Sequence, residues 1–309
     1  MEGILNINKP PGLSSHAVVA AVRRLIPGEK AGHTGTLDPL AGGVLPVCLG
    51  KATRIAEYVI DLPKGYRAAV ELGTTTDTED AAGKVLAEQP VPLLNRASLE
   101  EIFRSLTGTR EQLPPVYSAV KYRGKPLYYW TRRGRDVVRR ARRITIYRLE
   151  LLQYNQAGQP HLLFDVVCSR GTYIRTLAAE IGSRIGCGAY LFSLERRFVG
   201  PFSLAEACTL EQLRDAAGEG KLGRFLQPMD RPLQHLPALS IDDQAVLALK
   251  QGKTLTAAAL GLEGSAVLPG DSLLRIYDSR GIFKALARWE STAAADILRT
   301  VKYLATDEG

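Results

Sequence analysis

Short stretches in which apolar and polar residues alternate recur along this chain and predict β-strands. The first two are 3–10 and 66–72. Two longer stretches, 143–154 and 161–169, follow each other closely. Because helices do not alternate regularly with these strands, as βαβ units would require, the pattern favours an α+β fold. We expect a mixed, largely antiparallel sheet with helices packed against it.

Apolar residues at helical spacing predict helices between these strands. In the first of them, Val18, Val19 and Val22 share one face. Polar residues that can cap a helix start precede several such segments. The candidates are Ser14 or Ser15, Ser98 with Glu101, Thr172, and Thr209 with Gln212. Each of these positions is expected to begin a helix.

The proline-rich segment 228–239 is the best candidate for a linker between two domains. A chain of 309 residues is long enough for one large domain and a small one, each with its own core. Beyond the linker, a short amphipathic helix and several strands would suit a small β-barrel. We therefore expect domains at 1–232 and 233–309.

The positive charge of the chain is concentrated in one segment. The net charge is +8, yet residues 121–143 hold ten Lys/Arg and the single acid Asp136, so the rest of the chain is nearly neutral. Tyr122, Tyr129 and Trp130 lie among these cations. Cations mixed with aromatic rings suit phosphates and unstacked bases, although a merely solvated face is the alternative. We interpret 113–143 as an inserted, partly mobile basic arm that binds nucleic acid. Its candidate contacts are Lys121, Arg123, Lys125, Arg132 and Arg133.

Other features of the composition exclude broad classes of protein. The sequence contains no apolar run of about 18 residues and no signal-peptide pattern, so we expect a cytoplasmic protein without membrane contact. Its four cysteines have no C-x-x-C spacing and are expected to be buried, inert thiols. Its four histidines have no second ligand at metal spacing, so we predict no metal site.

The segment 32–43, GHTGTLDPLAGG, is the part of the chain least like ordinary scaffold. Its glycines give the backbone freedom, and Pro39 restricts the conformation of Asp38 before it. An acid is thus held in a shaped loop that can come close to a ligand. On spacing alone, Asp38 could equally cap the following turn.

Five motifs in order resemble those of the bacterial tRNA pseudouridine-55 synthases, the TruB-type family. They are 5–19, 32–54, 64–83, 113–134 and 169–182, and together they cover most of residues 1–205. The resemblance implies a pseudouridine-synthase catalytic domain followed by a PUA-like RNA-binding domain. It also implies an isomerase without cofactor or metal, monomeric, that converts uridine 55 in the TΨC arm of tRNA.

The resemblance also implies roles for individual residues. Asp38 matches the catalytic aspartate, and Arg175 in GTYIRTL is the residue expected to lie against it. Tyr66 is expected to stack on the flipped uracil, and the Tyr173 hydroxyl to help remove the proton from carbon 5. The remaining matches are His33 as a contact to the RNA loop, Lys64 as a phosphate contact or a support of the fold, Leu194 as an apolar wall, and Arg196 as a weaker RNA contact.

Two positions leave questions open. The family often has Leu-Arg-Arg where this chain has Leu194-Glu195-Arg196, which puts the first arginine contact in doubt. Lys9 before Pro10 could contact a phosphate or could simply be solvated.

Two rival functions fit parts of the same sequence. The first is a catalytically silent RNA-binding or RNA-folding protein, against which the presence of both Asp38 and Arg175 argues. The second is a glycosidase that releases a base by water attack, which would typically use two carboxylates. Asp77, Glu79 and Asp80 would be its second set, but they fall in a turn-rich segment that we expect to be exposed.

Overall fold

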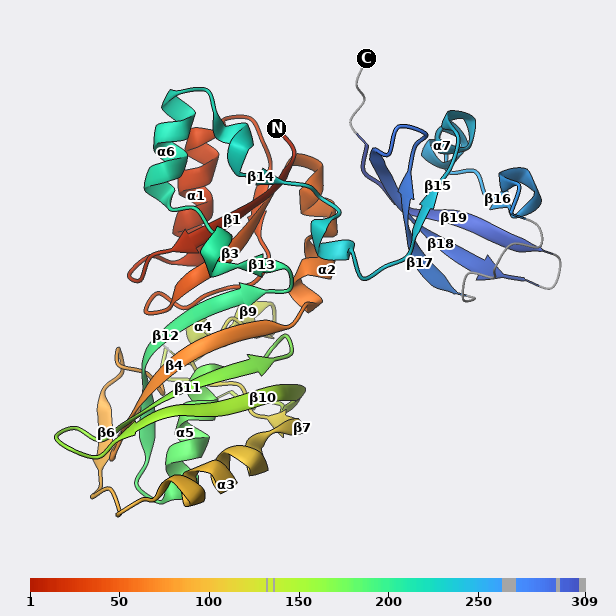
Figure 1. The fold of residues 1–309 in the computed structure, drawn as a ribbon. Coiled ribbons are helices and arrows are strands. Elements are labelled where there is room, and N and C mark those ends of the chain that lie inside the picture. The colour runs from red at the N-terminus through yellow and green to blue at the C-terminus, as the bar shows by residue number, and fades with distance from the viewer. Residues whose placement is uncertain (132, 136, 263–270, 293–294, 306–309) are drawn as a thin grey trace.

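The computed structural model describes residues 1–131, 133–135, 137–262, 271–292 and 295–305. A ten-stranded sheet forms its centre (Figure 1). The main path runs β14-β1-β3-β12-β4-β11-β10-β7, with β2 paired to β3 and β13 to β12. Its strands are β1 (Gly3–Lys9), β2 (Ala31–His33), β3 (Gly42–Leu49), β4 (Lys64–Leu72), β7 (Gly108–Gln112), β10 (Arg142–Asn155), β11 (His161–Cys168), β12 (Ala189–Val199), β13 (Phe202–Ser203) and β14 (Leu226–Gln227).

All the pairings in this sheet are antiparallel except that of β12 with β3, which is parallel. The expected mixed, largely antiparallel sheet is therefore confirmed. The parallel contact brings Arg196 on β12 opposite Gly43 on β3. It joins the two halves of the sheet at the loop that carries Asp38.

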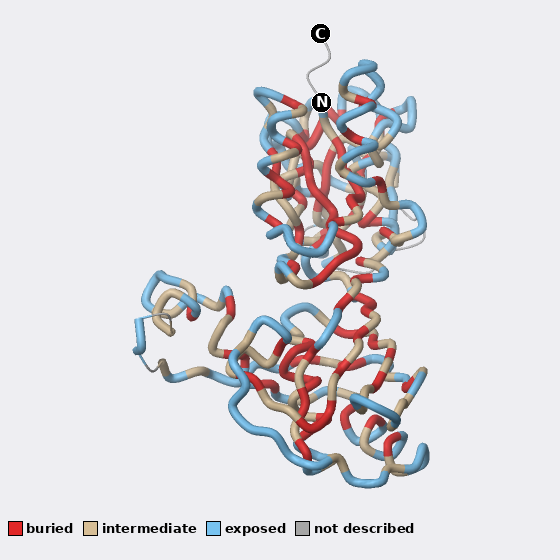
Figure 2. Tube along the Cα trace, turned by 90° about the vertical axis from the view of Figure 1, so that its left-hand side faces the viewer, coloured by how far each residue is buried: buried red, intermediate tan, exposed pale blue. Residues whose placement is uncertain are grey.

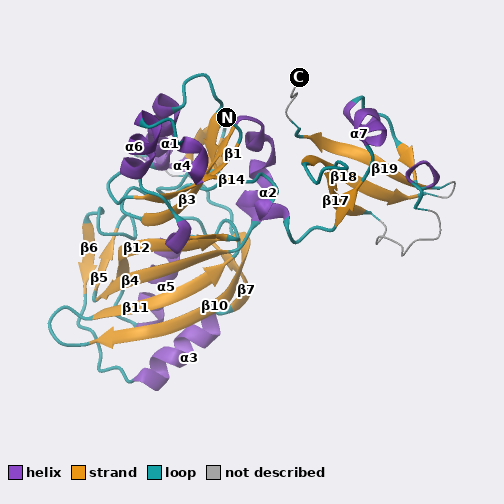
Figure 3. Ribbon diagram, turned by 45° about the horizontal axis from the view of Figure 1, so that its top comes forward, coloured by secondary structure: helices purple, strands orange, loops and turns teal. Residues whose placement is uncertain are grey.

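Helices pack on the sheet in two groups (Figure 3). The helices α1 (Ser15–Leu25) and α6 (Leu210–Gly218) contact each other near β1. On the other part of the sheet, α3 (Arg96–Leu106) packs on β10 and α5 (Ile174–Ile185) packs on β12 and β4, and the two helices touch. Apolar side chains from all four helices join one continuous core with the strands. Figure 2 shows buried residues following the interior of the fold, with exposed ones on the surrounding loops. The short helix α2 (Ala56–Asp61) follows a 3₁₀ turn at 50–55.

The helix starts confirm two of the four expected caps. Ser14 caps α1 by accepting a hydrogen bond from the Ala17 amide, and Thr209 with Gln212 forms a capping box on α6. The expected Ser98–Glu101 box is wrong, because α3 begins one turn earlier, where the Asn95 side chain accepts from the Ser98 amide. Thr172 does not open α5 either. That helix starts after Tyr173, and the Thr172 hydroxyl donates to the Ser169 carbonyl.

Two hairpins and a short helix are not part of the ten-stranded sheet. One hairpin pairs β5 (Thr74–Thr76) with β6 (Val85–Glu88). The other pairs β8 (Lys121–Tyr122) with β9 (Lys125–Pro126) and leads into α4 (Leu127–Thr131). The second hairpin and α4 lie within the basic segment 113–143.

The C-terminal part is a smaller sheet of five strands in the order β15-β17-β18-β19-β16. Its elements are β15 (Ala238–Ser240), α7 (Asp243–Lys250), β16 (Leu255–Thr256), β17 (Ser272–Tyr277), β18 (Phe283–Ser291) and β19 (Asp296–Tyr303). The sheet curls into a PUA-like half-barrel with its own apolar core, next to α7 (Figure 1). Leu286 and Leu304 also join a cluster with Ile55 and Val59, so the small domain packs on the α2 region of the large one.

Two expectations about composition can be set against the fold. All four cysteines are free and buried, which confirms that they are structural thiols. Burial raises the pKa of Cys48 to about 12, so its reactive thiolate form is disfavoured. In the described ranges, no helix has the length and apolar character needed to cross a bilayer.

Candidate active site

The loop that carries Asp38 is held at several points by distant parts of the chain. The Ser15 hydroxyl donates to the Leu37 carbonyl over 3.1 Å and accepts from the Leu37 amide over 2.8 Å. The Gly12 amide donates to the Pro39 carbonyl over 2.7 Å. Ser15 at the start of α1 and Gly12 in the turn before it thus hold the residues on both sides of Asp38, which fixes the backbone that carries the carboxylate.

Lys9 supports the same loop from the interior. Its side chain is buried, and its ammonium group donates to the carbonyls of Pro10 and Leu13 over 3.0 and 2.6 Å, with Pro39 at 3.5 Å. Both expectations for Lys9, a phosphate contact and a solvated lysine, are therefore wrong. Burial lowers its pKa to about 8, with the Arg196 charge acting in the same direction. The carbonyl contacts explain why a cation is retained there.

Asp38 and Arg175 meet across the chain as an ion pair. Arg175 Nε lies 2.9 Å from Asp38 Oδ2. The arginine side chain is 5% exposed and the aspartate side chain 36% exposed, so the pair has one buried and one accessible partner. Arg175 lies in the first turn of α5, whose apolar residues Ile174, Leu177 and Ile181 anchor the helix to the core. A counter-charged carboxylate with an open side is suited to act on a bound nucleotide.

The Arg175 guanidinium also joins two further segments. Its Nη1 donates to the Thr78 carbonyl and its Nη2 to the Tyr117 carbonyl, each over 2.9 Å. Asp80 Oδ2 lies 3.6 Å from Arg175 Nε. The arginine therefore ties together the Asp38 loop, the β5–β6 connection and the base of the basic arm.

The acidic segment 77–80 is not exposed as expected. Asp80 is buried and accepts hydrogen bonds from the Thr78 hydroxyl and the Ala82 amide over 2.6 and 3.0 Å. Glu79 is partly buried and accepts from the Thr176 hydroxyl over 2.7 Å, and burial raises its pKa. Sequence reasoning missed Asp80 as part of the site. The signal present was an acidic turn after the short strand β5, which follows the strand that carries Tyr66.

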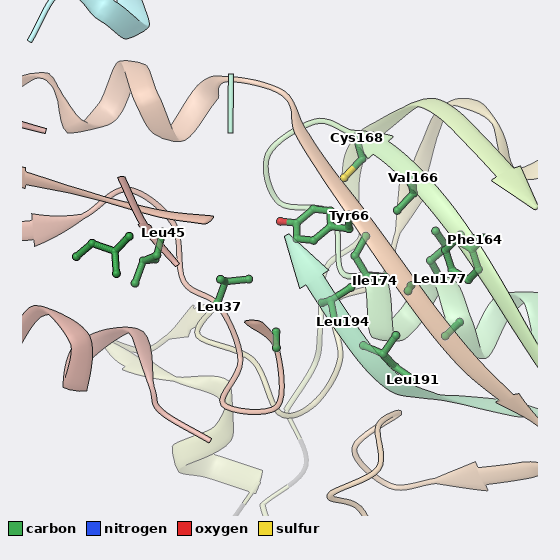
Figure 4. Packing of buried hydrophobic residues seen from close by; sticks show 14 of the residues in the cluster. Leu37, Leu45, Tyr66, Phe164, Val166, Cys168, Ile174, Leu177, Leu191 and Leu194 are labelled. Carbon is green, nitrogen blue, oxygen red and sulfur yellow. The ribbon is translucent and has the colours of Figure 1, made fainter. Parts of the chain in front are cut away.

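Tyr66 lies within the core beside the ion pair. It is 8% exposed, and burial raises its pKa while the Arg196 guanidinium next to it opposes that shift. Ile174 and Leu194 lie beside its ring (Figure 4). The three side chains come from β4, α5 and β12. They form an aromatic and apolar wall next to a charged group, which suits a planar base.

Tyr173 and His33 are also expected to contact the substrate. Tyr173 precedes Arg175 by two residues, and burial raises the pKa of its phenol. His33 packs edge-to-face against His16 with ring centroids 5.2 Å apart. Burial, His16 and Arg196 together lower the pKa of His33 to about 4, so this imidazole is neutral near pH 7. A neutral ring is compatible with an RNA contact and unsuited to act as a general acid.

Comparisons with known proteins identify the family of this chain. Residues 23–174 match the TruB family pseudouridylate synthase N-terminal domain, and residues 175–234 match the tRNA pseudouridylate synthase B C-terminal domain. The tRNA pseudouridine synthase B of Geobacillus thermodenitrificans is 48% identical over 87% of this chain and 91% of its own length. That of an Azoarcus species is 41% identical over 100% of this chain and 97% of its own. This chain belongs to the TruB family of tRNA pseudouridine synthases.

Solved structures of other protein assemblies share this fold. A chain in the crystal structure of a Cbf5-Nop10-Gar1 complex superposes with a TM-score of 0.74 and 29% identity, covering 98% of this chain and 85% of that one. A chain in an H/ACA RNP bound to a substrate RNA containing 2'-deoxyuridine gives a TM-score of 0.73 and 26% identity, covering 99% and 86%. The expected pseudouridine-synthase fold with a PUA-like domain is thus confirmed. Like other TruB proteins, this chain is an isomerase.

Two of the expected RNA contacts lie inside this TruB protein. Arg196 is 1% exposed, and its guanidinium donates to the carbonyls of Val44 and Gly35 over 2.6 and 3.1 Å. Lys64 is buried and donates to the carbonyls of Ile60 and Leu62 over 2.7 and 2.8 Å. Of the two roles expected for Lys64, these contacts favour support of the fold. The placement of Arg196 likewise corrects its expected RNA contact to a support beneath the Asp38 loop.

Gly43 is required where Arg196 passes under that loop. Its φ is +98°, and a Cβ at this position would lie 2.3 Å from the Arg196 carbonyl oxygen. Any side chain would therefore separate β3 from β12 at their parallel contact. At Gly43, the glycine of the motif allows the backbones of β3 and β12 to pack closely.

Glu195, where this chain departs from the usual TruB pattern, lies away from the site. Side chains alternate along β12, so Glu195 points to the opposite face from Leu194 and Arg196. It pairs in register with Arg67 on β4 and forms an ion pair with Arg197. Arg67 in turn binds Asp165 through two hydrogen bonds of 2.8 Å. The substitution therefore joins a charged row on the outer face of the sheet.

The basic arm presents its cations on aromatic rings. Arg133 lies over Tyr129 at 3.7 Å and Arg123 over Tyr122 at 5.4 Å, with Lys125 over Tyr129 at 5.7 Å. Lys121, Arg123, Lys125 and Arg133 are exposed, whereas Arg132 lies outside the described residues. The arm reaches the cluster around Asp38 through the Tyr117 carbonyl and not through these cations. In the described part of the chain, no group of three His, Cys, Asp or Glu is placed to hold a metal ion.

Proposed function

We propose that this enzyme converts uridine 55 in the TΨC loop of tRNA to pseudouridine, with Asp38 as the catalytic carboxylate. The observation that carries the proposal is the ion pair between Asp38 Oδ2 and Arg175 Nε at 2.9 Å, with its carboxylate side accessible. The Geobacillus and Azoarcus relatives are tRNA pseudouridine synthases. The proposal extends this activity to the residues of the present site.

The reaction is an isomerisation that needs no external oxidant, reductant or phosphoryl donor. The bond between N1 of uracil and C1' of ribose breaks, the base turns, and a bond from C5 to C1' replaces it. The proton on C5 leaves and N1 ends protonated, so the atoms of substrate and product are the same. Residues of this chain can supply a carboxylate, a base platform and a proton carrier for these steps.

The position of Asp38 beside Arg175 allows two chemical roles for its carboxylate. Its carboxylate either attacks the nucleotide covalently or removes a proton from the ribose. In both routes Arg175 supplies the counter-charge for the carboxylate in a largely buried setting. Removing the arginine would leave the accessible Asp38 and the buried Asp80 without their shared counter-charge.

The uracil must leave its stack before Asp38 can reach it. Extruding a base costs a few kcal/mol, to be offset by stacking and polar contacts in the pocket. Tyr66 offers an aromatic platform, and Leu194 an apolar wall beside it (Figure 4). Tyr173 would help to remove the C5 proton late in the reaction, its hydroxyl passing its own proton on as it takes up this one. His33 would contact the RNA loop as a neutral ring.

Recognition of the tRNA would be shared between the two domains, which we place at 1–232 and 233–309. The exposed cations of the arm would contact phosphates of the TΨC hairpin, and the PUA-like domain would hold the acceptor end. We propose that the protein acts as a monomer in the cytoplasm.

An unmodified tRNA transcript tests the target and the reaction class together. Incubation should yield intact RNA with pseudouridine at position 55, and a transcript with cytidine at 55 should stay unmodified. Pseudouridine elsewhere but not in the TΨC loop would overturn the target and leave the reaction class standing. Free uracil with an abasic RNA would identify a glycosidase, and tight binding without either product would identify a silent RNA-binding protein.

A further inference from the structure

The side chain of Gln112 is bonded to the backbone of Tyr173 at both of its polar atoms. Its Nε2 donates to the Tyr173 carbonyl over 3.1 Å, and its Oε1 accepts from the Tyr173 amide over 2.8 Å. Gln112 is 2% exposed, so water does not compete for these bonds. The same Tyr173 carbonyl also accepts from the Leu177 amide, the first bond of helix α5. Gln112 therefore fixes the residue at which α5 begins.

Gln112 also lies at the base of the basic arm. It is the last residue of β7, and its register partner on β10 is Arg142. The arm leaves the sheet after Gln112 and returns to it at Arg142. Five residues further along the arm, the Tyr117 carbonyl accepts from Arg175 Nη2. The base of the arm is thus bonded twice to the start of α5, at Tyr173 and at Arg175.

From this double attachment we infer that Gln112 is a positioning residue for the reaction. It holds Tyr173 directly, and Arg175 through the two-residue step along the start of α5. The inference deepens the proposed function, because it rests on Tyr173 and Arg175 acting on the base and on Asp38. A mere helix-start support would stabilise the fold and leave turnover by the folded enzyme unchanged.

The first test replaces Gln112 by leucine, which has a similar size and no polar atoms. Single-turnover rates on tRNA transcript and tRNA dissociation constants are measured on the full chain, with folding checked by circular dichroism. We expect the rate to fall at least tenfold with the dissociation constant within twofold of wild type. A wild-type rate, or a change confined to tRNA binding, would overturn the inference.

The control is Gln212→Leu, which removes one glutamine bond to a helix start at an exposed position. Gln212 Oε1 accepts from the Thr209 amide over 2.9 Å at the start of α6, remote from Asp38. This variant should lose thermal stability without any loss of rate. If it slowed turnover as much as Gln112→Leu, the effect would belong to general helix stability, and the positioning role would be rejected.

The second test, Gln112→Glu, decides the matter even if the leucine variant does not fold. A protonated carboxyl can donate to the Tyr173 carbonyl and accept from its amide, as the amide group does, whereas a carboxylate cannot donate. Burial favours the protonated form and the partner strand's Arg142 the ionised one. We expect the rate relative to wild type to fall as pH rises from 5 to 9. A ratio independent of pH would overturn the inference, whereas failure of the proposed function would show as an inactive wild type.

Discussion

Asp80 Oδ2 lies 3.6 Å from Arg175 Nε, so a second, buried carboxylate shares the arginine that faces Asp38. The Thr78 hydroxyl and the Ala82 amide hold Asp80 in place. Asp80 is itself too enclosed to meet a nucleotide, with its side chain 8% exposed. Asp80 therefore helps to orient the guanidinium, together with Asp38 and the carbonyls of Thr78 and Tyr117.

Replacing Asp80 by asparagine should therefore impair catalysis more than binding. The amide keeps the size of the side chain but removes one of the two charges that hold Arg175. We expect the single-turnover rate to fall by about 10- to 100-fold, equivalent to about 1.4–2.7 kcal/mol, with tRNA affinity unchanged. Asp61→Asn, which removes an exposed ion pair with Arg170, serves as the control and should keep the wild-type rate. A wild-type rate for Asp80→Asn would show that Arg175 needs only Asp38.

The residues of this network show where sequence reasoning reached its limit. The strands and the apolar helix faces could be predicted, because periodicity is a local property. The pairing of Asp38 with Arg175 came from family motifs and not from spacing. Asp80, Lys9 and Gln112 act through partners far away or across a turn, and nothing in their local sequence separates a buried polar residue from a solvated one.

The helix caps illustrate the same limit on a smaller scale. Ser98 with Glu101 has the pattern of a capping box, yet Asn95 caps the helix three residues earlier. Both residues satisfy the local rule, and the start that buries Leu99 and Phe103 in the core is the one adopted. Tertiary packing decided between two helix starts of equal local quality.

Lys9 should prove essential for stability. Replacing it by methionine keeps the length and apolar character of the stem but leaves the carbonyls of Pro10 and Leu13, and the more distant one of Pro39, without this donor. An unsatisfied buried polar group costs about 1–3 kcal/mol, so we expect a loss of about 2–4 kcal/mol in the free energy of unfolding by urea. Lys30→Met, at an exposed position, should change that free energy by less than about 0.5 kcal/mol. Equal stability of Lys9→Met and wild type would contradict a stabilising role for the Lys9 hydrogen bonds.

His33 predicts a specific dependence of stability on pH. Its folded pKa is about 4, below its ordinary value of 6.5, so between these values the unfolded chain binds a proton that the folded chain does not. Stability should therefore fall as pH drops from 6.5 towards 4, and this destabilisation is absent well above pH 6.5. His33→Gln should remove about 1–2 kcal/mol of that acid sensitivity, after allowance for partial exposure. Denaturant unfolding of wild type and variant at pH 7 and pH 4.5 measures the difference. An unchanged pH dependence in the variant would show that a group other than His33 takes up the proton on unfolding.

The basic arm should control the salt dependence of tRNA binding. Removing one phosphate contact lowers the slope of log affinity against log salt concentration by about 0.7–0.9. Replacing Lys121 or Arg123 by alanine should reduce the slope by about that amount and leave the rate at saturating enzyme unchanged. Arg148→Ala, at an exposed position on β10, is the control for charge alone. If the plots of log affinity against log salt concentration had the same slope for the arm variants and wild type, the arm would not contact the RNA phosphates.

The most direct test of the catalytic claim is the Asp38→Asn variant under single-turnover conditions with enzyme in excess over tRNA. The substitution is nearly isosteric and removes only the charge that faces Arg175. We expect the dissociation constant for tRNA to stay within about threefold, and the rate of pseudouridine formation to fall by a factor on the order of 10⁴ or more. Isomerisation at the wild-type rate by this variant would show that the carboxylate of Asp38 is not the catalyst.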